Sequence, residues 1–148
     1  MLQQLLQSWM PFLLLLAAWL AFGIYVRRKT KDIKTPVVGQ ILTPSNSITL
    51  ARRADSTNIL RSYEVLIDGN PVGTIGAGSV AHFPVEAGPH TVAVRINWCK
   101  CPDLHVEKHE GEHVLLWCGA TYNDWRCTFM GFLQPKKYVY VRPPASDA

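Results

Sequence analysis

The sequence predicts an all-β domain, built as a sandwich or a barrel, behind a single N-terminal transmembrane helix. Residues 10–26 form an apolar segment without any charged side chain. From residue 48 onward, short runs of alternating apolar and polar residues are separated by turn residues about every ten positions, and no helical period follows residue 34. The expected parts are a transmembrane anchor with a basic juxtamembrane segment (1–34), a linker (35–46), a β-sandwich domain (47–142) and a disordered tail (143–148).

The apolar segment is long enough to cross a bilayer. Residues 10–26 read MPFLLLLAAWLAFGIYV, and Trp9 and Tyr25 stand near the two ends, where amphipathic rings prefer the membrane interface. A cleaved signal peptide would begin with basic residues, whereas the nine residues before this segment carry no basic side chain. We therefore expect a retained anchor, with the lipid bilayer as one partner.

The basic residues around the segment predict its orientation. Cationic side chains stay on the cytoplasmic side of a membrane, so the expected protein is single-pass with its C-terminal domain in the cytoplasm. The same cluster favours contact with anionic lipid headgroups. None of these cations precedes the segment, and the five that follow it are Arg27, Arg28, Lys29, Lys31 and Lys34.

The charge of the remaining chain is balanced. The whole sequence has a formal net charge of +4, but residues 35–148 contain ten Lys or Arg and ten Asp or Glu. A nucleic-acid-binding domain needs a basic face of its own. We therefore expect no nucleic-acid partner.

Seven or eight short strands are expected between residues 47 and 142. Asp68-Gly69 lies between two alternating runs and predicts a tight hairpin, because Gly tolerates the positive φ of such turns. Pro71 and Pro84 lack the amide hydrogen of a central strand and indicate sheet edges. Residues 119–127 are expected to be irregular. The expected strands cover 48–52, 62–67, 72–75, 79–85, 90–98, 104–108, 113–118 and 137–142, with a further short one at 129–133.

The segment 90–98 has the clearest alternation in the chain. Apolar residues occupy every second position, which is typical of a strand with one buried and one solvated face. Arg95 lies on the solvated face in this register. The buried face is expected to consist of Val92, Val94, Ile96 and Trp98.

The string YEVLIDGNPVGTIGAGSVAHFPVEAGPHTVAVRINWC has a familiar order of turns and strands. It resembles the PEGA-type and related immunoglobulin-like modules of bacterial surface and membrane proteins. It is closer still to small membrane-anchored bacterial proteins of uncharacterised function that carry a Trp-Cys after the V-x-V strand. The resemblance spans about Ile48 to Cys118, and it implies an immunoglobulin-like β-sandwich without catalytic activity. The second cysteine of WCKC and the segment GATYNDWRC depart from the PEGA-type pattern.

No motif in the sequence predicts catalysis. GxSxG, HExxH and a phosphate-binding glycine loop are absent. Cys101 and His105 are close enough in sequence for a nucleophilic pair, but no activating context accompanies them. His105, His109 and His113 are spaced by four, which suits a metal site only on a helix, so solvated turn residues are the preferred interpretation. We expect no enzyme, no catalytic residue and no bound cofactor other than a potential zinc ion.

The four cysteines are the one group of side chains in the sequence that suggests a chemical role. If segments 90–98, 104–108 and 113–118 are successive antiparallel strands, the cysteines converge at one end of the sandwich, with the Cys99 and Cys118 Cα atoms within disulfide range. Reduced and partly buried thiols, a zinc site and disulfides all remain open. A cytoplasmic domain favours reduced thiols first, zinc second and disulfides third. The candidate metal ligands are Cys99, Cys101, Cys118 and Cys127.

The function expected from these observations is a membrane-tethered, non-enzymatic interaction or scaffold module with a protein partner. The alternative is a metal- or redox-responsive membrane protein that uses the cysteine cluster.

Overall fold

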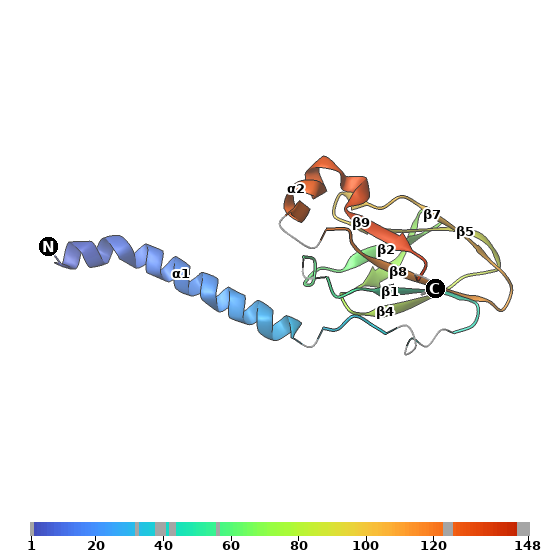
Figure 1. Cartoon of the computed structure of the whole chain (residues 1–148), viewed down its shortest axis with the longest axis horizontal. Coiled ribbons are helices and arrows are strands. Elements are labelled where there is room, and N and C mark those ends of the chain that lie inside the picture. Colours follow the sequence, from blue (N-terminus) through green and yellow to red (C-terminus); the bar gives the residue numbers. More distant parts are fainter. Residues whose placement is uncertain are drawn as a thin grey trace. The chain divides into compact units, whose positions relative to one another are not determined.

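The structure is a computed structural model. It describes residues 2–31, 33–37, 41, 44–55, 57–122 and 126–144. The chain divides into two compact units, Met1–Ile33 and Lys34–Ala148. Figure 1 shows the first as one long helix and the second as a β-rich unit.

The first unit is helix α1, Leu2–Thr30. Its segment Trp9–Arg28 is long and apolar enough to cross a membrane. The large side chains of this segment are exposed, including Phe12 and Trp19. By its length and composition, this helix is compatible with a membrane anchor.

The second unit contains two β-sheets. All strand pairs are antiparallel except β1 with β8, which is parallel. The first sheet has the order β4 (Val80–Pro84), β1 (Ser47–Arg52), β8 (His113–Ala120), β9 (Val139–Arg142). The second has the order β3 (Asn70–Ile75), β2 (Tyr63–Ile67), β5 (Gly88–Ile96), β6 (Cys99–Lys100), and β7 (Leu104–Lys108) also pairs with β5.

Both sheets contribute to one apolar core. The alternation of β5 is confirmed at Val92, Val94 and Ile96, which are buried, and at Arg95, which is exposed. Strand β1 is buried along its whole length because it lies between β4 and β8. The prediction of a mostly β unit behind one apolar helix is therefore confirmed. The core also includes Ile48, Leu50, Val65, Ile67, Ile75, Leu116 and Val139.

The local turn chemistry was predicted correctly around β2 and β3. Asp68 and Gly69 have φ values of 52° and 78° and connect two antiparallel strands, as a tight hairpin turn requires. Pro71 lies in β3 and Pro84 in β4, and each strand is the edge of its sheet. Both prolines therefore occupy positions where a missing amide hydrogen is tolerated.

The short strand expected at 129–133 is wrong. This segment belongs to helix α2, Arg126–Leu133, which a short 3-10 helix, η2 (Pro135–Lys137), follows. Phe129, Phe132 and Leu133 are spaced by three and four residues, which places them on one face of a helix. The expectation that no helix follows residue 34 is corrected with it. Of the irregular segment expected at 119–127, residues 119–120 belong to β8 and residues 126–127 to α2, while residues 123–125 lie outside the described part of the structure.

The expected burial of Trp98 is also wrong. Strand β5 ends at Ile96, and Asn97 has a φ of 51°, so Asn97-Trp98 forms a two-residue turn. Ile96 pairs with Cys99 across this turn. The turn ends the strict alternation, so the Trp98 side chain is 61% exposed while Cys99 points into the core.

The cysteine prediction assumed three successive antiparallel strands, and the structure changes that order. Strand β7 pairs with β5, but β8 lies in the other sheet, beside β1 and β9. The turn at Glu110-Gly111 therefore connects the two sheets and is not a hairpin within one of them. Cys99 and Cys118 consequently belong to opposite sheets, although both contribute to the same core cluster.

Candidate functional site

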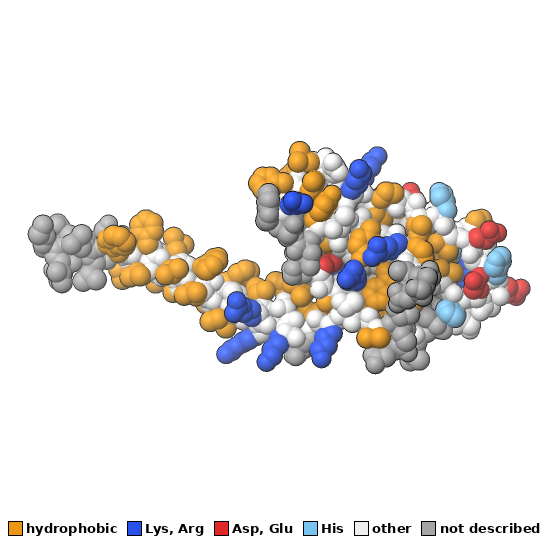
Figure 2. All heavy atoms as spheres, viewed as in Figure 1, with side chains coloured by type: hydrophobic (Ala, Val, Ile, Leu, Met, Phe, Trp, Pro, Cys, Tyr) orange, Lys and Arg blue, Asp and Glu red, His pale blue; other side chains and the backbone are white. Residues whose placement is uncertain are grey.

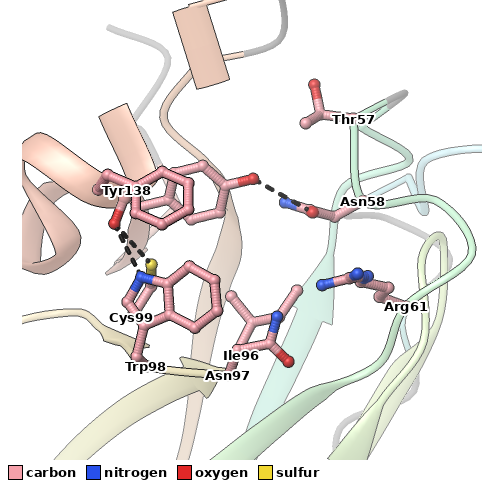
Figure 3. A pocket seen from close by; sticks show the side chains of 10 residues that line it. Thr57, Asn58, Arg61, Ile96, Asn97, Trp98, Cys99 and Tyr138 are labelled. Carbon is pink, nitrogen blue, oxygen red and sulfur yellow. Dashed lines mark hydrogen bonds between the residues drawn. The ribbon is translucent and has the colours of Figure 1, made fainter. Parts of the chain in front are cut away.

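The Asn97-Trp98 turn and helix α2 border a pocket of about 320 Å³. Figure 3 shows Trp98 and Tyr138 on one side of this pocket and Arg61 on another. The lining of the pocket therefore includes both aromatic rings and a cationic side chain. Its lining consists of Thr57, Asn58, Arg61, Ile96, Asn97, Trp98, Cys99, Gly131, Phe132 and Tyr138.

Trp98 is exposed but held in place. Its indole Nε1–H donates a hydrogen bond to the carbonyl oxygen of Gly131, at 3.0 Å. Its ring lies 5.3 Å from that of Phe132, centroid to centroid, in a tilted arrangement. A tilted aromatic pair at this distance is favourable, so the ring is fixed before any partner binds.

Helix α2 presents an apolar face beside Trp98. Phe129 is 62% exposed, and Phe132 and Leu133 are each 73% exposed. Gly131 is buried on the opposite side, against β6 and η2. Figure 2 shows hydrophobic side chains gathered over α2, with Lys and Arg side chains beside them. We call Trp98, Phe129, Phe132 and Leu133 the aromatic surface.

Cationic side chains predominate along α2 and η2. The segment 126–137 contains three basic residues and no acidic residue. Lys136 and Lys137 are exposed directly after α2, and Arg61 is exposed at the pocket. Among the described residues, no acidic side chain forms an ion pair with Arg61, Lys136 or Lys137. The site therefore combines an apolar face with a positive rim.

A buried arginine holds the wall of the pocket that carries Arg61. The Arg52 side chain is completely buried and donates hydrogen bonds to the carbonyl oxygens of Arg61 (2.5 Å), Asn58 (2.8 Å) and Ile75 (3.1 Å). Its guanidinium carbon lies 3.6 Å from the centre of the Tyr63 ring. Asp55 is 3.5 Å away and balances the charge. Buried charges are rare unless they are paired and hydrogen-bonded, as Arg52 is here.

A chain of hydrogen bonds connects Asp55 to the pocket. The Tyr63 hydroxyl donates to Asp55 Oδ2 at 3.4 Å and accepts from the Asn58 amide at 3.2 Å. Asn58 Oδ1 accepts from the Tyr138 hydroxyl at 3.3 Å. Burial, and then the negative charge of Asp55, raise the pKa of Tyr63, so its hydroxyl remains protonated and able to donate. The loop after β1 is therefore organised by buried polar side chains.

Three of the four candidate cysteines are buried free thiols: Cys99, Cys101 and Cys118. The Cys99 thiol donates to the Gly131 carbonyl at 3.5 Å, and Cys101 Sγ accepts from the Val94 amide at 3.2 Å. The side chain of Cys127 lies outside the described part of the structure, and only its backbone is placed, in α2.

Burial opposes the ionisation of these thiols. It raises the pKa of Cys99 and Cys101, and it raises that of Cys118 to about 12. Because the thiolate is the nucleophile and the metal ligand, a raised pKa opposes both roles. In the described residues, no group of three or more His, Cys, Asp or Glu side chains is arranged to hold a metal ion. The three described cysteines belong to the apolar core cluster.

The histidines singled out in the sequence do not meet at a site. His105, His109 and His113 are exposed, whereas Cys101 is only 2% exposed. Sequence analysis pointed to the cysteines and missed both the aromatic surface and the Arg52 network. The signal for α2 was the spacing of Phe129, Phe132 and Leu133, which are three and four positions apart in the segment FMGFL. For Arg52, the only signal was an arginine at the end of a strand, three residues before an aspartate.

The chain was also compared with known proteins. No family model matches it, and no curated protein is found to be similar to it.

Proposed function

We propose that the protein is a membrane-tethered, non-enzymatic interaction module that binds its partner through the aromatic surface. Helix α1 is the anchor, the β-rich unit is cytoplasmic, and the unit is an immunoglobulin-like sandwich of the PEGA-like kind. Binding at the aromatic surface brings the partner to the membrane, and the pocket beside Trp98 enlarges the area available for contact.

The aromatic surface carries this proposal. Large apolar patches on a domain surface mark sites of interaction, because exposing them to water costs free energy in the unbound state. Trp98 and Phe132 stack on each other, and Phe129 and Leu133 continue the same face of α2. Aromatic side chains that are fixed before binding lose little conformational entropy when a partner covers them.

Other features support the remaining parts of the proposal. The segment Trp9–Arg28 has the length and composition of a span, and the basic residues that follow it favour a cytoplasmic β unit. Two sheets of short, mostly antiparallel strands around one core support the proposal of an immunoglobulin-like sandwich. The buried thiols with raised pKa give less support to a redox or metal function than the aromatic surface gives to binding.

Site-specific photocross-linking in intact cells tests the proposal. A photoreactive amino acid replaces Phe132 on the aromatic surface and, as the matched control, Val72, an exposed apolar residue of edge strand β3 that is 44% exposed. We expect adducts, to protein or to lipid, at position 132 and not at position 72. Equal yields at both positions, or no adduct at position 132, would refute a dedicated binding surface.

A further inference from the structure

We propose that the aromatic surface docks on the headgroup layer of an anionic bilayer, the membrane in which α1 is anchored. This inference rests on the proposed function and names the partner of the same surface. In the docked state the four apolar side chains enter the boundary between headgroups and acyl chains, and Lys136, Lys137 and Arg61 contact lipid phosphates.

The composition of the surface suits this boundary. Interfacial protein segments combine Trp, Phe and Leu on one face with Lys or Arg at the polar edge. Here Trp98, Phe129, Phe132 and Leu133 supply the apolar side, and Lys136 and Lys137 follow directly after the helix. The indole N–H of Trp98 already donates to Gly131, so its ring enters an apolar layer without an unsatisfied donor.

The charge around the surface favours an anionic lipid over a neutral partner. Arg61, Lys136 and Lys137 are exposed, and no described acidic side chain forms an ion pair with them. Two acidic residues share pockets with these cations, Glu64 with Arg61 and Asp103 with Lys136 and Lys137, but each already forms an ion pair, Glu64 with Arg95 and Asp103 with Lys100. Asp55 is buried against Arg52 and Tyr63. An anionic membrane surface attracts such an unneutralised positive rim. The pocket next to Arg61 has room for a headgroup phosphate.

The tether makes a weak contact sufficient. Residues 31–46 connect α1 to β1, and Thr35 among them already accepts a hydrogen bond from the Ala54 amide of the β unit, so this short connection keeps the unit within reach of the bilayer that holds α1. Linked sites experience effective concentrations in the millimolar range. A patch that would bind free vesicles poorly can therefore be docked for most of the time.

Quenching of Trp98 by brominated lipid tests the inference in the full-length chain. Trp9 and Trp19 are replaced by Phe, because both lie in the candidate span and would be quenched there. The protein is placed in nanodiscs of brominated phosphatidylcholine, with or without phosphatidylglycerol. Subtracting the signal of the same chain with Trp98→Phe isolates Trp98. We expect Trp98 to be quenched in the anionic nanodiscs and much less in the zwitterionic ones.

Substitution of Lys136 and Lys137 measures how much these two cations contribute to docking. Removing one cation from an anionic surface lowers docking about fivefold, so Lys136→Gln with Lys137→Gln should lower it about 25-fold. The control pair is Arg53→Gln with Arg142→Gln, two exposed cations outside the aromatic surface and its pocket, which should change docking far less. Helix content and unfolding midpoint establish that each variant is folded.

The outcomes separate this inference from the proposed function. Absence of Trp98 quenching in anionic nanodiscs overturns membrane docking, as does quenching that is equal in both lipids and unchanged by the lysine variants. If Trp98 is unquenched while position 132 cross-links to a protein, the surface binds a protein and the proposed function stands. If Trp98 is unquenched and position 132 gives no adduct, both fail.

Discussion

The carbonyl oxygen of Gly131 accepts a hydrogen bond from the indole of Trp98, at 3.0 Å. The same oxygen accepts a longer one, at 3.5 Å, from the thiol of Cys99. Two consecutive residues, Trp98 of the β5–β6 turn and Cys99 of β6, therefore hold the same carbonyl group of α2, one with an exposed and one with a buried side chain. This double contact explains how an eight-residue helix, which is too short to be stable alone, keeps a defined position.

Replacing Trp98 by Ala should loosen α2 more than it destabilises the fold. The variant loses one hydrogen bond and one aromatic pair, about 1–2 kcal/mol together. A tryptophan buried in the core would cost about 3–5 kcal/mol. Urea unfolding measures the global change, and hydrogen exchange measures the loss of protection in residues 126–133. Trp98→Phe is the control, because it keeps the ring pair. A global loss above about 3 kcal/mol would mean that Trp98 belongs to the core after all.

The sequence contained enough information for the elements that local chemistry determines. Asp68 and Gly69 specify their turn because both positions adopt a positive φ. Val92, Val94 and Ile96 specify a buried strand face because they occupy every second position. Trp98 continues that period but lies after Asn97, whose positive φ starts a turn. Whether Asn97 adopts this conformation depends on the pairing of Ile96 with Cys99, which alternation alone does not reveal.

The site depended on contacts between distant segments. The carbonyl groups that hold Arg52 belong to Asn58, Arg61 and Ile75, so its burial is decided only when β1, the following loop and β3 are assembled. A sequence pattern assigns a charged side chain to the surface by default. Helix α2 was missed for the opposite reason, because a short apolar run fits a strand and a helix almost equally well.

Replacing Arg52 by Met should be among the most destabilising single changes in the β unit. The substitution leaves Asp55 as a buried charge without its cation and three carbonyl groups without their donor. Breaking a buried pair from one side costs about 3–5 kcal/mol. Arg53→Met is the matched control, because the neighbouring side chain is exposed and should cost less than about 0.5 kcal/mol. Chemical unfolding of both variants provides the measurement, and equal losses would contradict the role of the Arg52 network.

Arg52→Lys should restore little of the lost stability. The guanidinium spreads its donors over three carbonyl groups and lies over the Tyr63 ring, whereas an ammonium group is a compact charge that cannot reproduce this geometry. Full rescue by Lys would show that charge alone, and not the directional hydrogen bonds, is what the site requires.

An introduced cysteine should report the orientation of the β unit. The three described native thiols are buried with raised pKa, so they should react slowly with a thiol reagent in the folded protein. Val72→Cys adds a thiol at an exposed position of edge strand β3. If the unit is cytoplasmic, an impermeant maleimide should label this variant only after the cells are permeabilised. Labelling in intact cells would place the unit outside and reverse the proposed topology.

The stability of the β unit should depend on pH through His90 and Asp68. His90 Nδ1 lies 2.7 Å from Asp68 Oδ2, and Asp68 also accepts the amide hydrogen of Thr91 at 2.8 Å. The hydrogen bonds with Asp68 and with the Glu86 carbonyl raise the pKa of His90. The hydrogen bonds with His90 and with Thr91 lower the pKa of Asp68.

These two shifts act over opposite ends of the pH range. The folded state holds the His90 proton more tightly, so this contribution is complete below the unfolded pKa of about 6.5 and is lost as the pH rises through the folded value. The folded state holds the Asp68 proton less tightly, so that contribution is present above about pH 3.9 and is lost as the pH falls through the lowered value. The pair therefore stabilises the unit most between about pH 4 and 6.5.

Urea unfolding of the wild type and of His90→Gln across this range measures the effect. The difference between the two proteins should be largest near pH 5 to 6 and should shrink as the pH rises through the raised pKa of His90 and the imidazole becomes neutral. His105→Gln, at an exposed histidine of β7, is the control and should show a smaller pH-dependent difference. The Asp68 side chain is exposed to solvent, so salt should reduce the effect. A difference that grows toward alkaline pH would contradict the charged His90–Asp68 pair.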